Sequence, residues 1–350
     1  MTVLTPASDS SGSTPRRPTI SDVARAAGVS IAVVSYALNG RPGVSAATRE
    51  RVLRVADEFG WRPSAAARSM RSGPRAVGLV LSRGVGTAAH ATSFLDFVTA
   101  IQDVVAARGL ALVLQIVDSP EAAAATYREW WAERRFDVMV VTDVLTHDPR
   151  IEVLRRIHAP AVVVAPREVA AGLASVWLDE TESFTRVATY LLELGHRSIA
   201  AVTAPIALHR TRMRLDALEA AIGSAGGTLV HEATNATAEE AAAATRRLLT
   251  AADPPSAIVF DTDQMAVAAL DVARRTGLQV PWDLSILAGS DSALCRLATP
   301  SISTLPLPLG ELGAAAGHAV LAVLDGEQDV GTCVPVRGIA VRGSTGPRSR

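Results

Sequence analysis

The residues of this chain that could bind a charged partner are concentrated near its N-terminus. Ten arginines lie within residues 1–73 together with only five carboxylates, so this segment carries a formal charge of +5. The rest of the chain carries −6, because the net charge of the whole is −1. A basic segment attached to an acidic remainder favours a polyanionic partner for the basic segment, although a chance imbalance of surface charge would give the same numbers.

The chain lacks the short motifs that mark common catalytic and cofactor-binding sites. We find no glycine-rich dinucleotide or phosphate loop, no histidine pair at metalloprotease spacing and no nucleophile elbow. The two cysteines, Cys295 and Cys333, have neither metal-ligand spacing nor the number that a disulfide framework needs, which is typical of a reduced, cytoplasmic protein. We therefore expect no enzymatic activity, no cofactor and no metal.

Three short helices are predicted to position the side chains of the basic segment. Thr19 and Asp22 have the spacing of a capping box, which marks the start of the first helix. Ser30 can cap a second helix. Ser45 can cap a third helix that runs to about Phe59, with the Phe59 ring turned inward.

Two segments lie outside the predicted globular parts. Residues 1–15 are rich in Ser, Thr and Pro and lack the apolar core of a secretion signal, so we expect a disordered tail and no export. Residues 61–73 contain a short helix-favouring run between Pro63 and Gly73-Pro74. An isolated helix under roughly 12 residues is marginal in water, so we interpret this run as a hinge.

From residue 75 onward, apolar runs alternate with amphipathic stretches, which predicts doubly wound α/β units. The predicted buried strands are residues 76–81, 112–117, 138–141, 161–164, 199–202, 257–260 and 284–288. The predicted helices are residues 94–107, 121–135, 180–194, 210–224, 238–251, 263–275 and 308–324. Ligands of open parallel sheets bind outside the carboxyl ends of strands, so a cleft between two lobes is the expected ligand site.

Two sets of motifs, in this order, resemble those of a single family. The basic segment and hinge contain Thr19-Ile-Ser-Asp-Val-Ala-Arg-Ala-Ala-Gly-Val-Ser30, Val34-Ser35, Leu38-Asn39-Gly40, Pro42-Gly43-Val44-Ser45, Thr48-Arg49, Arg62-Pro63-Ser64 and Ala67-Arg68-Ser69-Met70. The remainder contains Glu193-Leu194-Gly195-His196-Arg197, Asp263-Gln264-Met265-Ala266, Pro281-Trp282-Asp283-Leu284-Ser285 and Gly289-Ser290-Asp291. Together they resemble the LacI/GalR family of transcriptional regulators.

The resemblance implies an N-terminal all-α helix-turn-helix domain followed by an α/β two-lobed, periplasmic-binding-protein-like effector domain with doubly wound parallel sheets. It implies a cytoplasmic homodimer, with no membrane contact, that binds double-stranded, pseudo-palindromic operator DNA as a repressor and responds to a small-molecule effector, with a sugar or polyol as the leading class. The corresponding segments are a tail (1–16), the helix-turn-helix (17–62), the hinge (63–74), the two-lobed part (75–343) and a second tail (344–350). Within the two-lobed part, the first lobe is expected to comprise roughly residues 75–174 and 305–330, and the second lobe residues 175–304 and 331–343.

The resemblance also assigns DNA-binding positions in the head. The phosphate-contacting positions match Thr19, Ser30, Ser35 and Asn39, and the base-reading positions match Ile31, Ala32 and Tyr36. Family members usually have Arg where this chain has Tyr36, and Arg can bind guanine with two hydrogen bonds whereas Tyr cannot. We therefore expect weaker hydrogen-bond readout in the major groove. The alternatives are that Ile31 packs against the helical core and that Ala32 merely avoids a clash.

In the hinge, the resemblance assigns a minor-groove role to three residues. Ala67 is small enough to let two hinge helices approach each other, and Arg68 can reach phosphates or the groove floor. Met70 matches the apolar side chain that family members insert between central base pairs, which kinks the duplex. The alternative for Met70 is a linker residue packed against the body.

Four residues match effector-binding positions of the family: Phe94, Arg214, Asp263 and Asp291. The alternatives are core packing for Phe94, an ordinary surface helix position for Arg214 and a helix cap for Asp263. Thr262 and Pro166 replace the Asn and Asp that relatives often carry, so a common hexose cannot be assumed.

Three other functions fit parts of the same sequence. A periplasmic sugar-binding protein would share the two-lobed body, but it would have a secretion signal and no DNA-binding head. An enzyme on an α/β scaffold would need catalytic groups that we do not find. A cytosolic small-molecule-binding protein without operator control remains the alternative to a regulator.

Overall fold

The computed structural model describes residues 18–38, 41–59, 61, 76–83 and 91–348. The chain divides into two compact units, residues 1–73 and residues 74–350. The hinge segment and the predicted DNA-binding positions Asn39, Ala67, Arg68 and Met70 lie outside the described residues.

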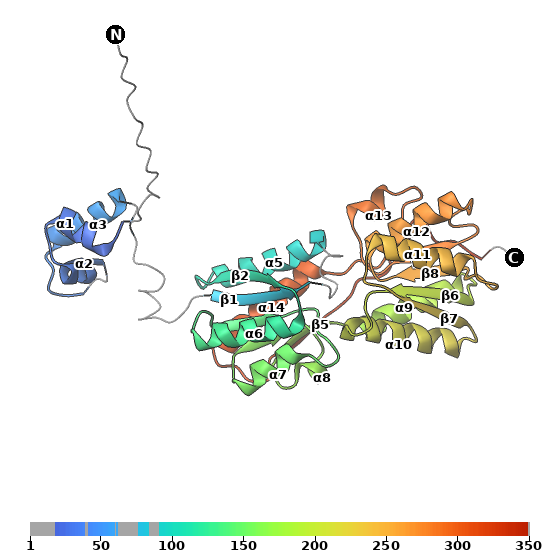
Figure 1. Ribbon diagram of the computed structural model, residues 1–350, viewed down its shortest axis with the longest axis horizontal. Helices are drawn as coiled ribbons and strands as arrows, with labels where there is room; N and C mark the ends of the chain where they lie inside the picture. Colours follow the sequence, from blue (N-terminus) through green and yellow to red (C-terminus); the bar gives the residue numbers. More distant parts are fainter. Residues whose placement is uncertain (1–17, 39–40, 60, 62–75, 84–90, 349–350) are drawn as a thin grey trace, which may run out of the picture. The chain divides into compact units, whose positions relative to one another are not determined.

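The first unit is a three-helix head, as the sequence predicts. Its helices are α1 (Ile20–Ala27), α2 (Ile31–Leu38) and α3 (Ala46–Glu58) (Figure 1). The predicted caps are present, because Asp22 accepts a 2.9 Å hydrogen bond from the Thr19 backbone, and Ser30 and Ser45 accept from amides three residues later. The apolar faces of the helices meet in one small core formed by Val23, Ala24, Ala27, Val34, Ala37, Val52, Val55 and Ala56.

The prediction that Phe59 turns inward is wrong. Helix α3 ends at Glu58, and the Phe59 side chain is 42% exposed. The chain leaves the helix at this point, where the Trp61 amide bonds back to the Ala56 carbonyl, and Trp61 packs against the core instead.

The second unit contains two parallel-sheet lobes. The sheet of the first lobe has the order β11-β5-β4-β3-β1-β2. Its strands are β1 (Ala76–Ser82), β2 (Ala111–Val117), β3 (Val138–Val141), β4 (Ala161–Val163), β5 (Ala174–Leu178) and β11 (Gly331–Val334). One face carries α5 (Ala91–Ala106) and α14 (Leu309–Leu324), and the other carries α6 (Pro120–Ala132), α7 (Pro149–Arg156) and α8 (Arg167–Ala170) (Figure 1).

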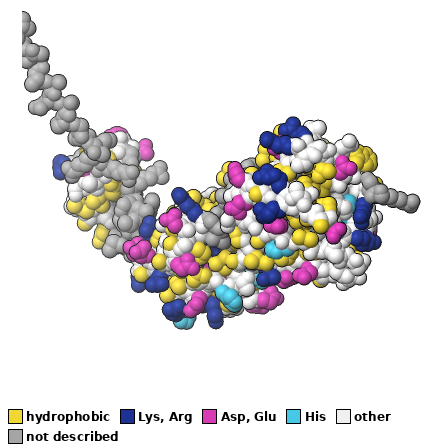
Figure 2. Space-filling model, turned by 45° about the vertical axis from the view of Figure 1, so that its right-hand side comes forward, with side chains coloured by type: hydrophobic (Ala, Val, Ile, Leu, Met, Phe, Trp, Pro, Cys, Tyr) yellow, Lys and Arg dark blue, Asp and Glu magenta, His cyan; other side chains and the backbone are white. Residues whose placement is uncertain are grey.

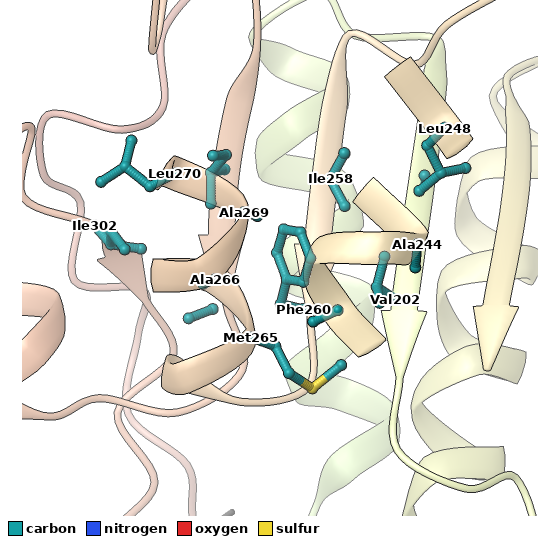
Figure 3. Packing of buried hydrophobic residues seen from close by; sticks show 14 of the residues in the cluster. Val202, Ala244, Leu248, Ile258, Phe260, Met265, Ala266, Ala269, Leu270 and Ile302 are labelled. Carbon is teal, nitrogen blue, oxygen red and sulfur yellow. The ribbon is translucent and has the colours of Figure 1, made fainter. Parts of the chain in front are cut away.

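The second lobe repeats this architecture with the sheet order β10-β9-β8-β6-β7. Its strands are β6 (Ser198–Thr203), β7 (Thr228–Ala233), β8 (Ala257–Phe260), β9 (Ser285–Ala288) and β10 (Ser303–Thr304). Its helices are α9 (Glu180–Glu193) and α10 (His209–Ser224) on one face, and α11 (Ala238–Leu249), α12 (Asp263–Arg275) and α13 (Ala293–Leu297) on the other. Figure 3 shows the second of these faces, where Phe260 and Ile258 pack against Met265, Ala269 and Ala244.

Two glycines set the separation of α5 and α14, the helices that close one side of the first lobe. A β carbon at Gly313 would collide with the Phe97 carbonyl oxygen, and one at Gly317 would lie 2.8 Å from Val104. The absence of side chains at these positions therefore allows α5 to lie directly against α14, which fixes the position of the α5 aromatic residues.

The predicted strands and long helices are present, but the prediction that residues 112–117 form a buried strand is wrong, because β2 lies at the edge of its sheet and most of its side chains are exposed. Several other elements were not predicted. Strands β5, β7, β10 and β11 and helices α7, α8 and α13 are additional. Because β5 and β11 pair with each other in the first sheet, residues 175–178 and 331–334 lie in the first lobe, not in the second as the sequence had indicated. The segment after β11 does return to the second lobe, where Ala340 pairs with Thr304.

Within the described ranges, no single helix combines the length and apolar composition needed to cross a membrane. Among the described helices, α1 and α2 together have sufficient length and apolar composition, but the two are inclined to each other by 97°. Both helices contribute to the core of the head, α1 through Val23, Ala24 and Ala27 and α2 through Val34 and Ala37.

Candidate DNA-binding surface and ligand cavity

Helices α1 and α2 have the geometry of a helix-turn-helix. They are inclined by 97° and joined by the three residues 28–30, which matches the roughly 90–120° and three- to four-residue turn of this motif. The turn requires Gly28, because its backbone has φ = +65°, a left-handed conformation that side chains disfavour.

Helix α2 exposes the side chains that were predicted to read bases. Val34 and Ala37 point into the head core, whereas Ala32 is exposed, Ile31 is 49% exposed and Tyr36 is 43% exposed. Ile31 is not part of the core cluster. These three side chains therefore form an outward surface that can offer methyl contacts and one phenolic hydroxyl.

The described residues predicted to contact phosphates lie at the starts of α1 and α2 and within α2. The Thr19 hydroxyl donates a 2.6 Å hydrogen bond to Asp22, and the exposed Ser30 hydroxyl accepts from the Val33 amide. Ser35 is half-buried. The Arg41 guanidinium lies 5.8 Å from the centre of the Tyr36 ring, within cation–π range, and places a positive charge next to this surface.

The second unit contains a cavity lined by residues of both lobes. It has a volume of about 110 Å³, whereas a single water molecule needs roughly 10–15 Å³ by the same measure. It lies at the carboxyl ends of β3, β4 and β5, as expected for open parallel sheets. Its lining comprises Phe94, Phe97, Thr142, Asp143, Val144, Val164, Ala165, Pro166, Trp177, Leu178, Glu180, His209, Arg210, Met213, Leu307, Leu309 and Leu312.

Backbone and charged contacts join the two lobes beside this cavity. Asp143, which follows β3, forms a 3.1 Å ion pair with Arg210 of α10. The His209 amide donates to the Val144 carbonyl at 2.8 Å, and Leu145 and Leu208 form an isolated antiparallel bridge. A molecule bound in the cavity would therefore touch the segments that hold the lobes together.

Two buried polar atoms of the cavity lining have no hydrogen-bond partner. They are the Thr142 hydroxyl, on a residue that is 6% exposed, and Nδ1 of His209. Burial lowers the pKa of His209 below its ordinary value, and the nearby Glu168 and Asp216 carboxylates offset only part of this effect. This shift favours the neutral form of His209. Buried polar groups are normally satisfied, so both atoms are candidates for contact with a ligand.

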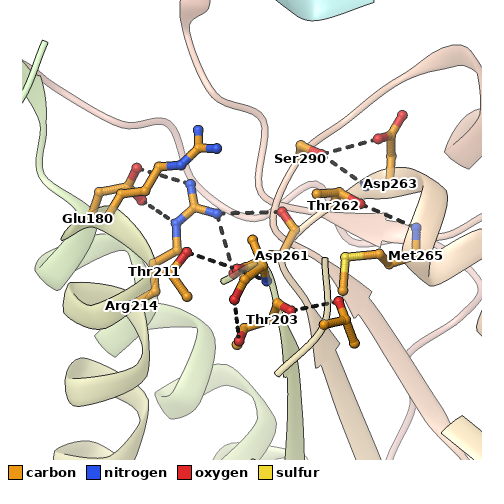
Figure 4. Close-up of polar contacts among 12 residues, drawn as sticks. Glu180, Thr203, Thr211, Arg214, Asp261, Thr262, Asp263, Met265 and Ser290 are labelled. Carbon is orange, nitrogen blue, oxygen red and sulfur yellow. Dashed lines mark hydrogen bonds and ion pairs between the residues drawn. The ribbon is translucent and has the colours of Figure 1, made fainter. Parts of the chain in front are cut away.

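Arg214 does not line the cavity but holds a residue that does. Its guanidinium is 2% exposed and donates to both carboxylate oxygens of Glu180, at 2.8 and 3.0 Å (Figure 4). It also lies 3.5 Å from Asp261 and 4.8 Å from the centre of the Phe184 ring. Burial opposes the charge on Arg214, but Glu180 and Asp261 outweigh it and raise the pKa above its ordinary value. Arg214 is thus a buried, charged positioning residue rather than a surface arginine.

The other predicted effector residues are spread over different sites. Phe94 lines the cavity, whereas Asp263 and Asp291 are not among its lining residues. Asp263 is the first residue of α12 and interacts with the Ser290 hydroxyl, while Thr262 caps the helix (Figure 4). Burial would raise the pKa of Asp291, but its ion pairs with Arg342 and Arg296 lower the pKa below its ordinary value.

Sequence reasoning missed most of the cavity lining. Thr142 and Asp143 directly follow a predicted strand, so their position at a carboxyl end was an available signal. Glu180 follows β5, which had not been predicted. The approach of Arg210 to Asp143 depends on how the two lobes fold against each other, and no local pattern reports it.

Two family models match this chain. Residues 19–64 match "Bacterial regulatory proteins, lacI family", and residues 188–345 match "Periplasmic binding protein-like domain". These matches confirm the predicted helix-turn-helix head and two-lobed body.

Curated relatives match over most of the chain. The HTH-type transcriptional regulator AglR of Rhizobium meliloti (strain 1021) is 30% identical over 300 residues, which cover 82% of this chain and 81% of the relative. The ribose operon repressor of Escherichia coli (strain K12) is 29% identical over 300 residues, which cover 84% and 89%. The crystal structure of the lac repressor dimer bound to operator and the anti-inducer ONPF shares the fold, with a TM-score of 0.83 at 22% identity over 95% of this chain and 100% of that one. The chain therefore belongs to the LacI family of bacterial transcriptional regulators.

Proposed function

We propose that this protein is a cytoplasmic repressor that binds a pseudo-palindromic operator as a homodimer and is controlled by a small molecule bound in the cavity between its lobes. The observation that carries the proposal is the 97° helix-turn-helix, whose second helix exposes Ile31 and Ala32 at its N-terminal end and Tyr36 about one turn further along. In this motif, that end of the second helix meets base edges in the major groove.

On the DNA side, Thr19, Ser30, Ser35 and Asn39 would contact phosphates and fix the register of the head, as the family positions imply. Ile31 and Ala32 offer only apolar contacts, which suit a thymine methyl group. The hinge residues Ala67, Arg68 and Met70 would then contribute through the minor groove.

Exposed apolar side chains of the first lobe support a homodimer. Leu114 and Ile116 on strand β2, at the edge of the sheet, are exposed, and so is Leu95 on α5. Figure 2 shows hydrophobic side chains lying between charged ones on one face of the second unit. An open sheet edge with apolar side chains favours association with another chain, and a twofold dimer requires a twofold operator.

On the effector side, the relatives favour a sugar or polyol, as the name of the ribose operon repressor illustrates. Phe94 would contact the ligand directly, and Arg214 would act by orienting Glu180. We also propose that Asp263 and Asp291 contact the ligand. Such contact would need a rearrangement of their present interactions with Ser290 and Arg342.

Selection of the full-length protein against a random oligonucleotide pool, followed by gel shifts at several salt concentrations, tests the DNA-binding function. We expect a twofold-symmetric consensus and an affinity that falls with salt, with a log–log slope near −0.9 per neutralised phosphate. A failure to select any sequence, with ligand binding retained, would instead favour a cytosolic small-molecule-binding protein without operator control. An enzyme would be indicated by turnover of the bound molecule.

A further inference from the structure

The cavity between the lobes has a mostly apolar lining. Three aromatic rings, those of Phe94, Phe97 and Trp177, contribute to it. Met213, Leu309 and Leu312 supply further carbon surface. A ligand gains affinity from such a lining in proportion to the apolar area that it buries.

The charged groups of the described lining already have partners. Both oxygens of Glu180 accept from Arg214, and Asp143 is paired with Arg210. The Asp143–Arg210 pair is neutral, Arg214 is shared between Glu180 and Asp261, and burial lowers the pKa of His209, which favours its neutral form. Each charged side chain of the described lining therefore already has an oppositely charged partner, and an ionised ligand would lose its hydration without gaining an unpaired counter-charge.

Among the buried side-chain atoms of the described lining, two have no hydrogen-bond partner: the Thr142 hydroxyl and Nδ1 of His209. A hydroxyl can both donate and accept, and a neutral imidazole nitrogen does one or the other. Two such atoms can satisfy one polar group of a ligand. A sugar would bring several hydroxyls into a lining that is mostly apolar, and each hydroxyl that was buried unpaired would weaken binding.

We propose that the effector of this cavity is an uncharged, mainly apolar molecule, aromatic or alicyclic, with one hydroxyl or carbonyl group that bonds to Thr142 and His209. This inference rests on the proposed role of the cavity as the effector site. It replaces the sugar or polyol that the relatives suggest, because most of the side chains that line this cavity are apolar.

Calorimetric titration of the full-length protein tests the ligand class. The probes are 2-phenylethanol and cyclohexylmethanol as apolar alcohols, and ribose and glucose as polyols. We expect both alcohols to bind at least about 10-fold more tightly than either sugar, with the negative heat-capacity change that marks burial of apolar surface. Tighter binding of a sugar, or no binding of either alcohol up to millimolar concentration, would overturn the proposal.

Two variants at one position test where the polar group of the ligand lies. Thr142→Val removes the free hydroxyl at nearly constant shape and should weaken 2-phenylethanol about 10-fold, because the alcohol loses its partner. Thr142→Ser keeps the hydroxyl and should stay within about 3-fold of the wild type. Equal binding by the valine and serine variants would refute the assigned contact.

Operator selection separates failure of this inference from failure of the proposed function. A protein that selects an operator but binds only sugars would refute the ligand class and leave the regulator intact. A protein that binds the alcohols at Thr142 but selects no DNA sequence would retain the ligand class and refute the regulator.

Discussion

Replacing Arg214 by methionine should destabilise the second lobe strongly. The change keeps a long side chain but removes the cation that lies 2.8 Å from Glu180 and 3.5 Å from Asp261, so two carboxylates remain buried without their partner. Removal of one member of a buried ion pair typically costs about 3–5 kcal/mol. At about 2–4 °C per kcal/mol for a domain of this size, the melting temperature should fall by about 10 °C.

The same helix provides a matched control for this prediction. Arg212 lies on α10 two residues earlier and forms a 3.8 Å pair with Asp216, in which both side chains are exposed. Arg212→Met should therefore change the free energy of unfolding by no more than about 1 kcal/mol. Differential scanning calorimetry of the full-length proteins would compare the two variants.

A double variant tests the stated cause of the loss. Adding Glu180→Gln to Arg214→Met removes one of the stranded carboxylates, so the double variant should be more stable than the sum of the two single changes predicts, by about 1 kcal/mol or more. Equal destabilisation by Arg214→Met and Arg212→Met, or strict additivity with Glu180→Gln, would refute the argument that buried charge causes the effect.

Three further predictions concern the head, the cavity and the last strands of the second lobe. Tyr36→Arg should change the preferred base at one position of each half-site in an oligonucleotide selection; an unchanged consensus would remove Tyr36 from the reading surface. Thr142→Val should raise the free energy of unfolding of the ligand-free protein by about 1–3 kcal/mol, measured by urea titration, because it removes an unpaired buried hydroxyl; a loss would show that the hydroxyl has a partner. Asp291→Asn should destabilise the protein at pH 7. Because Arg342 and Arg296 hold the pKa of Asp291 below its ordinary value in the folded state, this contribution is present above the unfolded pKa of about 4 and is lost as the pH falls through the folded pKa. A difference between wild type and variant that persists at pH 2 would contradict this assignment.

The predictions that succeeded rest on short-range patterns. The capping residues Thr19, Ser30 and Ser45 correctly mark the starts of all three head helices. Strands such as Val138–Val141 and Ala257–Phe260 are apolar without interruption because both of their faces are buried, so their sequence alone identifies them.

The elements that were missed have no such pattern. Strand β7 lies at the edge of its sheet with partly exposed side chains, and β10 has only two residues. Strand β11 joins the first sheet through its pairing with β5, although more than 150 residues separate them in the chain. Pairing between strands so distant in sequence depends on the tertiary fold, which cannot be predicted from the local amino-acid composition.

Sequence alone determined that this protein has a basic helix-turn-helix head and a body of alternating strands and helices, because capping residues and apolar periodicity act over a few positions. Only the tertiary structure decided the chemistry of the ligand cavity. It buries Arg214 against Glu180, pairs Asp143 with Arg210 across the two lobes and leaves the Thr142 hydroxyl free. These contacts join residues far apart in the chain, and which charges are neutralised there depends on which side chains the fold brings within a few ångströms of each other.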